Sequence, residues 1–277
     1  MREIEALRYR IKELETENVK NAYFGGKPYP EGLEEFPGVL RGQGFFPGGD
    51  GIWRDDPSDP PKYKFPNGGI MVLGNDFGCK DNPNPRSPGF IQCLARLDGF
   101  GFETPPTWNN IKEMLRKAGL PGDRCFFTNA FLGLRTCTKT NGPSPGAKVP
   151  KFVEICKRFF EFQLLTQEPE LIIYLGHEPR KLACSIMLGM EHAWATDNSF
   201  HDLDSIHDPI MHGSCTGGSK PIFPLMVVIN HPSDARRNHG NALKRLKPRQ
   251  YQGHTGADAE IALLAEAWKQ VKRNHES

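Results

Sequence analysis

Four short apolar runs mark the chain between residues 69 and 229, and each run ends at glycine or polar residues. They predict strands at residues 69–73, 125–128, 171–175 and 225–229. Helical spacing of apolar positions predicts helices at residues 107–117, 151–166, 178–188 and 257–272, and another capped by Ser87 before Pro88. Strands that alternate with helices are typical of a parallel sheet covered on both faces. We therefore predict an α/β fold, a three-layer α/β/α sandwich with a central parallel four-stranded sheet.

The first quarter of the chain has a different pattern. Residues 1–20 have apolar side chains three and four positions apart, which predicts an amphipathic helix. We expect this helix to pack on the core, with a dimer seam as the alternative. Residues 22–68 are rich in glycine and proline and predict short elements that wrap the surface. We divide the chain into an N-terminal helix with a Gly/Pro-rich extension, residues 1–68, and an α/β domain, residues 69–277.

Composition excludes several classes of protein. The chain has 277 residues, of which 38% are hydrophobic and 25% charged, and this excludes a disordered or fibrous protein. It contains no run of eighteen apolar residues, and its charged start does not resemble a signal peptide. Seven cysteines without a C-x-x-C pair fit reduced thiols. We expect a cytoplasmic monomer without a membrane partner.

Positive charge is concentrated near the end of the α/β domain. The formal net charge is only +2, but residues 236–249 contain six lysines and arginines and no acid. Such a stretch suits a surface that faces phosphates, and a solvated loop is the alternative interpretation.

The ends of the predicted strands contain the residues that point to a function. In an open α/β sheet, ligands bind beyond the carboxyl ends of the strands. The four ends read GNDFG at 74–78, TNAFL at 128–132, GHEP at 176–179 and NHPS at 230–233, and PPTWNNI at 105–111 opens a predicted helix. In this order they resemble motifs of the uracil-DNA glycosylase superfamily, namely G-Q-D-P-Y-H, L-N-A-x-L-T-V-R, the L-G strand, H-P-S and P-P-S-L-x-N-I. Each motif is common alone, so the joint order carries the resemblance.

The resemblance implies a fold and an activity. The fold would be uracil-DNA glycosylase-like, with residues 69–277 as the catalytic domain. The activity would be that of a monofunctional DNA glycosylase, which hydrolyses the N-glycosidic bond of a flipped uracil or C5-modified pyrimidine and leaves an abasic site. DNA would be the partner, with no cofactor and no metal. No lysine stands out as the Schiff-base nucleophile that a bifunctional lyase needs.

Two residues are candidates for catalysis. Asp76 follows the first predicted strand, where a carboxylate could orient water or offset positive charge on the sugar. A turn-capping aspartate is the alternative, and the resemblance implies the water-activating or cation-stabilising role. His231 could donate a hydrogen bond to O2 of the departing base, and the resemblance assigns it this role. A packed or exposed loop histidine is its alternative.

Five residues are candidates for binding the base. The Asn129 amide can pair with O4 and N3–H of uracil or thymine, whereas cytosine presents the opposite pattern; a turn-forming asparagine is the alternative. Phe102 matches the family's stacking phenylalanine, with Phe100 as its rival and core packing as the alternative. Asn75, Phe77 and Gly78 belong to the first motif. Gly78 stands where uracil-specific enzymes have a tyrosine that blocks the C5 methyl of thymine, so the pocket should admit larger C5 groups.

A further set of residues would contact the DNA backbone. The resemblance implies that Ser233 opens a loop that touches the minor groove and a phosphate, with residues 234–237 as the wedge. The basic stretch that follows would act as a backbone clamp with salt-dependent affinity. Its candidates are Arg236, Arg237, Lys244 and Arg245.

Metal binding has one candidate cluster, formed by His201, His207, His212 and Cys215. Their spacing matches no common zinc finger, so we predict a DNA-facing loop without metal, with zinc as the alternative. The cysteines show no iron–sulfur clustering. Two alternative functions stay open: a glycosylase for hypermodified pyrimidines of phage DNA, serving antiviral defence, and a noncatalytic DNA-binding homologue.

Overall fold

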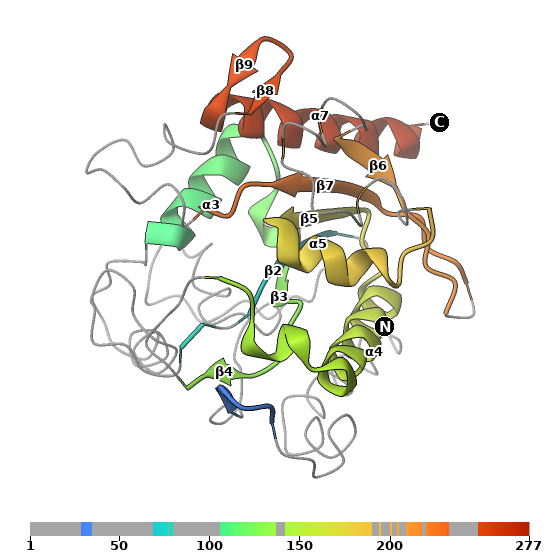
Figure 1. Ribbon diagram of the computed structural model, residues 1–277. Coiled ribbons are helices and arrows are strands. Elements are labelled where there is room, and N and C mark those ends of the chain that lie inside the picture. The colour runs from blue at the N-terminus through green and yellow to red at the C-terminus, as the bar shows by residue number, and fades with distance from the viewer. Residues whose placement is uncertain are drawn as a thin grey trace, which may run out of the picture.

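A single sheet of five strands forms the centre of the molecule (Figure 1). The computed structural model describes residues 29–34, 69–76, 78–79, 106–136, 142–189, 194, 200, 204, 209–217, 220–232 and 249–276, and every structural statement below refers to these. The strand order is β3-β2-β5-β7-β6. The strands are β2 (Ile70–Gly74), β3 (Cys125–Asn129), β5 (Leu171–Leu175), β6 (Ile210–His212) and β7 (Leu225–Ile229).

The four predicted strands are confirmed, and they run parallel to one another. The prediction of a four-stranded sheet was wrong in one respect, because β6 adds a fifth strand antiparallel to β7 at the edge. This strand has three residues, and its burial falls from Ile210 to the exposed His212. A short edge strand needs only one neighbour and produces no apolar run, so the sequence pattern did not indicate it.

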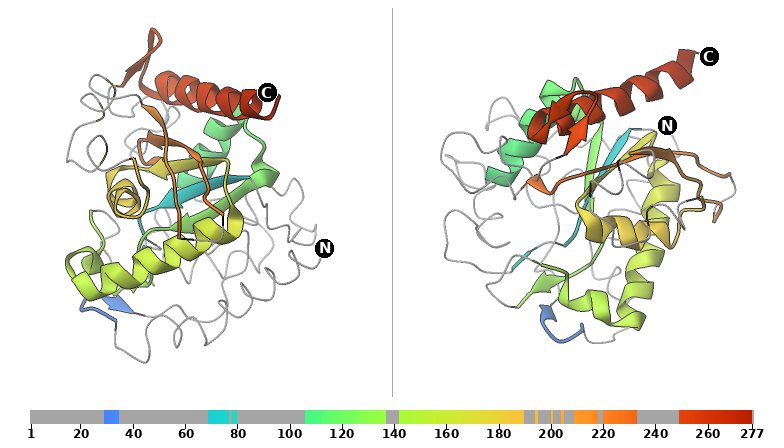
Figure 2. Two further views of the ribbon diagram at one scale, coloured as in Figure 1. Left: turned by 90° about the vertical axis from the view of Figure 1, so that its right-hand side faces the viewer. Right: turned by 45° about the horizontal axis from the view of Figure 1, so that its top comes forward.

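Helices cover both faces of the sheet, which confirms the three-layer α/β/α prediction (Figures 1 and 2). On one face α3 (Pro106–Lys117) and α7 (Gly256–Glu276) pack against alternate residues of the strands, such as Ile70 and Val72. On the other face α4 (Pro150–Gln167) and α5 (His177–Cys184) pack against the intervening ones, such as Met71 and Leu73. Because parallel strands are buried on both faces, β2, β5 and β7 are apolar along their length, and β3 is apolar up to Thr128.

The helix boundaries follow from local signals. Helices α3, α4 and α7 begin within one residue of their predicted starts, and Pro150 occupies the first turn of α4. The predicted helix at 178–188 is shorter, because α5 ends at Cys184 and the Ser185 hydroxyl donates to the carbonyl of Leu182 at 2.6 Å. Leu188 then forms a bridge with Ser214. The helices predicted at 1–20 and after Ser87 lie outside the described residues.

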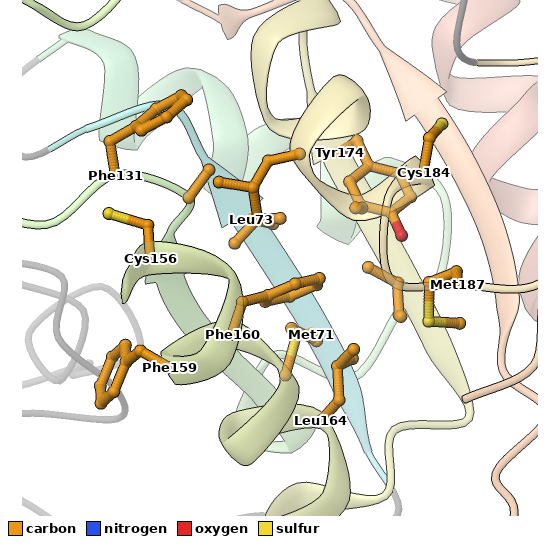
Figure 3. Packing of buried hydrophobic residues seen from close by; sticks show 14 of the residues in the cluster. Met71, Leu73, Phe131, Cys156, Phe159, Phe160, Leu164, Tyr174, Cys184 and Met187 are labelled. Carbon is orange, nitrogen blue, oxygen red and sulfur yellow. The ribbon is translucent and has the colours of Figure 1, made fainter. Parts of the chain in front are cut away.

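The core between α4 and the sheet is rich in aromatic residues (Figure 3). Phe159 and Phe160 of α4 are each 1% exposed, and Leu73 of β2 is fully buried. The same cluster extends to Tyr174 of β5, whose ring lies edge-on to Trp194 with centroids 6.2 Å apart. Each such buried side chain contributes roughly 1.5–3 kcal/mol relative to an exposed one.

Part of the N-terminal extension packs on the α/β domain. Strand β1 (Leu33–Glu34) pairs antiparallel with β4 (Leu134–Arg135), and Leu33 is buried in the α4 core. The ring of Tyr29 lies 6.3 Å from that of Phe152 in α4. Residues 29–34 therefore support β4, which supplies a charged side chain to the site described below. No described helix is long and apolar enough to cross a membrane.

Two phenylalanines provide a matched test of this core. We predict that Phe160→Ala lowers the free energy of unfolding by about 3–5 kcal/mol, because it leaves a cavity under the sheet. Phe223→Ala should change it by less than about 0.5 kcal/mol, because Phe223 is 66% exposed. Urea denaturation followed by circular dichroism measures both. Equal losses in the two variants would contradict the described packing.

Candidate active site

The carboxyl ends of four parallel strands meet at one edge of the sheet. Gly74 of β2 pairs with Asn129 of β3, and Leu175 of β5 pairs with Ile229 of β7. The residues that follow these positions therefore stand in a row across β3, β2, β5 and β7. This confirms the expectation that the strand ends converge. The parallel arrangement brings predicted site residues and their neighbours to the same edge. They are Asn129, Asn75 with Asp76, Gly176 with His177, and His231.

Asp76 is held by two different contacts. Its Oδ2 accepts a hydrogen bond from Nε of Arg135 at 2.8 Å and forms an ion pair with Nη2 at 2.7 Å, and its Oδ1 accepts the backbone N–H of Gly78 at 3.0 Å. The side chains of Asp76 and Arg135 are 5% and 4% exposed, respectively. The turn-capping contact that the sequence analysis gave as an alternative is therefore present, together with a buried ion pair that it did not predict.

Arg135 connects this ion pair to a neighbouring loop. Its Nη2 also donates to the carbonyl of Gly142 at 2.7 Å, and the side-chain amide of Asn75 donates to the same carbonyl at 3.3 Å. The backbone N–H of Arg135 donates to the carbonyl of Gly78 at 2.8 Å. Arg135 thus fixes both the turn after β2 and the carboxylate of Asp76, and a buried charge-assisted pair of this kind is rigid.

Asn129 is buried, and its side chain makes no hydrogen bond to the described residues. It is 1% exposed, and neither its amide oxygen nor its amide nitrogen has a hydrogen-bond partner among the described residues. It lies two positions after Phe127, so the alternation along β3 places it on the face that α3 covers. Leaving a buried polar group unsatisfied costs about 1–3 kcal/mol, so an unmatched donor and acceptor require an explanation.

Among the described residues, no atom lies close to the position of a side chain at Gly78. Its φ of +73° lies in the left-handed region, where glycine is favoured, and a Cβ built on it would meet no atom within 4 Å. The turn after β2 therefore leaves room next to Asp76, at the position where the sequence analysis expected a missing steric gate.

The loop that contains His231 is anchored on both sides. Before it, Asn230 is 1% exposed, and its side-chain amide donates to Oε1 of Glu260 at 2.5 Å. After it, the carbonyl of Pro232 accepts a hydrogen bond from the buried side-chain amide of Asn110 at 3.0 Å. His231 itself is partly exposed and lies beside Gly176, where an added Cβ would be 3.7 Å from the His231 Cβ.

A buried group of charges lies behind this loop. Arg249 donates to Oε2 of Glu260 at 2.9 Å, to both carboxylate oxygens of Asp204 at 2.7 Å, and to the carbonyl of Val228 at 2.6 Å. Burial raises the pKa of Glu260, although the positive charge of Arg249 opposes the increase. Burial lowers the pKa of Arg249, but the attraction of Glu260 and Asp204 is larger and leaves that pKa above its ordinary value.

Arg249 corrects one sequence interpretation. We counted it in the basic stretch that would face phosphates, but its side chain is 1% exposed and is surrounded by carboxylates. Its guanidinium also lies 5.1 Å from the ring centroid of Phe200, and that ring lies 4.3 Å from the ring of His177 at the start of α5. Arg249 is therefore a structural residue of the site and is not available to DNA.

Several predicted site residues lie outside the described residues. They are Phe77 and Phe102 of the base-binding set, and Ser233, Arg236, Arg237, Lys244 and Arg245 of the DNA-binding set. Of the candidate zinc ligands, His201 and His207 also lie outside, while His212 is exposed and Cys215 is 1% exposed. Within the described part of the chain, no group of three or more potential metal ligands is found.

The sequence analysis missed three residues of the site, although each left a signal. Arg135 matches the arginine of the strand motif, and Asn110 matches the asparagine of the motif that opens α3. Glu260 occupies a buried position on the apolar face of α7, between Ala257 and Leu264, where a carboxylate without a partner would be costly.

Comparison with known families agrees with this geometry. The family model of the uracil DNA glycosylase superfamily matches residues 68–252, which is more than half of the chain. The chain therefore belongs to the uracil DNA glycosylase superfamily. Members of this superfamily are typically DNA glycosylases, and they act on DNA. In the comparison with curated proteins, no sequence matches the chain.

Two arginines provide a matched test of the Asp76 ion pair. We predict that Arg135→Met lowers the free energy of unfolding by about 3–5 kcal/mol, because it leaves a buried carboxylate without its cation. Arg124→Met should cost less than about 1 kcal/mol, because the Arg124–Glu170 pair is 40% and 21% exposed. Chemical denaturation of both variants measures the difference. Losses of similar size would show that the Asp76 pair is not desolvated.

Proposed function

We propose that the protein is a monofunctional DNA glycosylase that hydrolyses the N-glycosidic bond of a flipped uracil or C5-modified pyrimidine and leaves an abasic site. The observation that carries this proposal is the buried amide of Asn129, whose donor and acceptor have no described partner at the carboxyl edge of the sheet. Membership of the superfamily supports the reaction type, and the amide supports the class of base.

The chemistry of the amide determines which bases it can bind. Its N–H₂ group can donate to O4 of uracil or thymine, and its oxygen can accept the N3–H of the same base. A base bound in this way would satisfy both groups of Asn129 that have no partner among the described residues. Cytosine presents a donor and an acceptor in the reverse order, so the same orientation of the amide would reject it.

His231 is proposed to stabilise the departing base. Asn129 ends β3 and His231 follows β7, and these two strands are three interstrand spacings apart. At about 4.8 Å per spacing, the two strands are separated by roughly 14 Å, a distance that two side chains and a pyrimidine ring together could span. An imidazole that donates to O2 would stabilise the negative charge that develops as the glycosidic bond breaks.

Asp76 is proposed to act on the sugar. Its two oxygens accept hydrogen bonds from Arg135 and Gly78, which hold the carboxylate in one orientation. A carboxylate held in this way could orient water or stabilise the positive charge on the sugar, the two roles that the superfamily motif implies. Phe102, Phe77 and Asn75 complete the proposed base-binding set.

Contacts to the DNA backbone are proposed for the segment after His231. Ser233, Arg236, Arg237, Lys244 and Arg245 would neutralise phosphates on either side of the flipped nucleotide. Affinity for DNA should then fall as salt is raised, because each neutralised phosphate releases counterions on binding.

Oligonucleotides that contain uracil, 5-hydroxymethyluracil or a G·T mismatch test the reaction, with alkali to cleave abasic sites. We predict that His231→Ala lowers the single-turnover rate about 10²–10³-fold, because a donor to the leaving group is lost. Asn129→Ala should weaken or abolish excision of the same base. His254→Ala, on the exposed hairpin before α7, is the control and should leave the rate unchanged. DNA binding without abasic product from any oligonucleotide would favour the noncatalytic homologue instead.

A second candidate function is excision of hypermodified pyrimidines of phage DNA, which would serve antiviral defence. The open space around Gly78 favours it, since a bulky C5 substituent needs room where uracil-specific relatives place a tyrosine. We predict that duplexes with bulky C5 substituents are cleaved at least as fast as uracil duplexes, as measured by abasic-site yield. Cleavage of uracil alone would rule this candidate out.

A further inference from the structure

Helix α7 contacts the end of β7 immediately before His231. Oε1 of Glu260 accepts the side-chain amide of Asn230 at 2.5 Å and its backbone N–H at 3.3 Å. One carboxylate oxygen therefore binds two atoms of the residue that precedes His231. Glu260 is fully buried, so water does not compete for these bonds.

The same carboxylate is held from its other side. Oε2 of Glu260 accepts a hydrogen bond from Arg249, which itself donates to the carbonyl of Val228. Arg249 is in turn held by Asp204. The end of β7 is thus fixed at residues 228 and 230 by a single buried network, and Asn110 fixes Pro232 beyond the histidine.

Stability alone does not account for this network. Burying an ion pair costs desolvation free energy, and the attraction between the two charges often offsets only part of that cost. Apolar residues of similar volume often stabilise a core equally well. Here Glu260 is fully buried in α7, and one of its oxygens accepts hydrogen bonds from both the backbone and the side chain of the residue that precedes His231. The contacts therefore determine the path of one loop.

We infer that Glu260 is a positioning residue for His231 and acts through Asn230. This inference rests on the proposed function, in which His231 donates to O2 of the departing base. With residues 230 and 232 fixed by buried partners, the loop presents the imidazole in one place before DNA binds. A displacement of about 1 Å in such a group can reduce a rate about 10²-fold.

A double-mutant cycle tests the inference with the full-length protein and the oligonucleotide that it cleaves fastest. Glu260→Gln should lower the single-turnover excision rate about 10–100-fold. The dissociation constant of this variant for DNA should change less than about twofold. In a His231→Ala background, Glu260→Gln should have no further effect, because the group that it positions is absent. Loss by the same factor in both backgrounds would overturn the inference and assign Glu260 a general structural role.

Two further variants keep the test decisive. Asn230→Ala removes the side-chain hydrogen bond to Glu260, the shorter of the two bonds, and leaves the Arg249–Glu260 pair intact, so it is the variant of choice if Glu260→Gln does not fold. It should give the same loss in rate, and an unchanged rate would overturn the inference. Asp258→Asn changes an exposed carboxylate in the first turn of α7 and should leave the rate unchanged.

Hydrogen exchange separates this inference from the proposed function. Asn230→Ala and Glu260→Gln should increase exchange of the backbone amides of residues 229–231, while the amides of β2 and β5 stay protected. This readout needs no substrate, so it applies even if the wild-type protein excises no base. Unchanged exchange at residues 229–231 would overturn the inference, whereas absence of abasic product in the wild type would overturn only the proposed function.

Discussion

Parallel pairing of four strands is the constraint on which the remaining structure depends. Because the strands run in the same direction, their carboxyl ends and the polar residues that follow them must lie along one edge. Several polar side chains at this edge are buried, among them Asp76, Asn129 and Asn230, and a buried polar group needs a partner. Asp76 and Asn230 have partners in the protein, whereas the Asn129 amide has none among the described residues. The first two groups build the edge, and the Asn129 amide is the group proposed to bind a base.

The fold was predictable where a short stretch of sequence determines it. Each of the four parallel strands is an apolar run buried on both faces, and its limits agree with the prediction to within one residue. Strand β6 and the β1–β4 pair were not predicted, because strands of two or three residues depend on the partner that they find in space. Similarly, α5 ends before its predicted limit, where the Ser185 hydroxyl binds the carbonyl of Leu182 and Leu188 forms a bridge with Ser214. The helical spacing of apolar residues does not indicate either contact.

The site was predictable to the extent that motifs mark the strand ends. Asp76, Asn129 and His231 stand at the expected edge, and their catalytic and binding roles stay predictions. The partners of these loops were not predicted, because the hydrogen bonds join residues far apart in the chain. Asp76 and Arg135 are separated by 59 positions, and Asn110 and Pro232 by 122. Such pairs are determined by how the helices pack on the sheet, and the pattern of residues along the sequence does not indicate these long-range contacts.

The burial of Arg249 has a consequence for how this scaffold can diversify. Arg249 binds the carbonyl of Val228, so the described residues on the two sides of positions 233–248 are joined at one fixed junction. The entropy of closing a loop grows slowly with its length, by about 0.6 kcal/mol for each doubling. A segment with its ends tied in this way can change in length and sequence while the sheet beneath it stays folded. Evolution or design could therefore exchange the proposed DNA-contacting segment as an independent cassette.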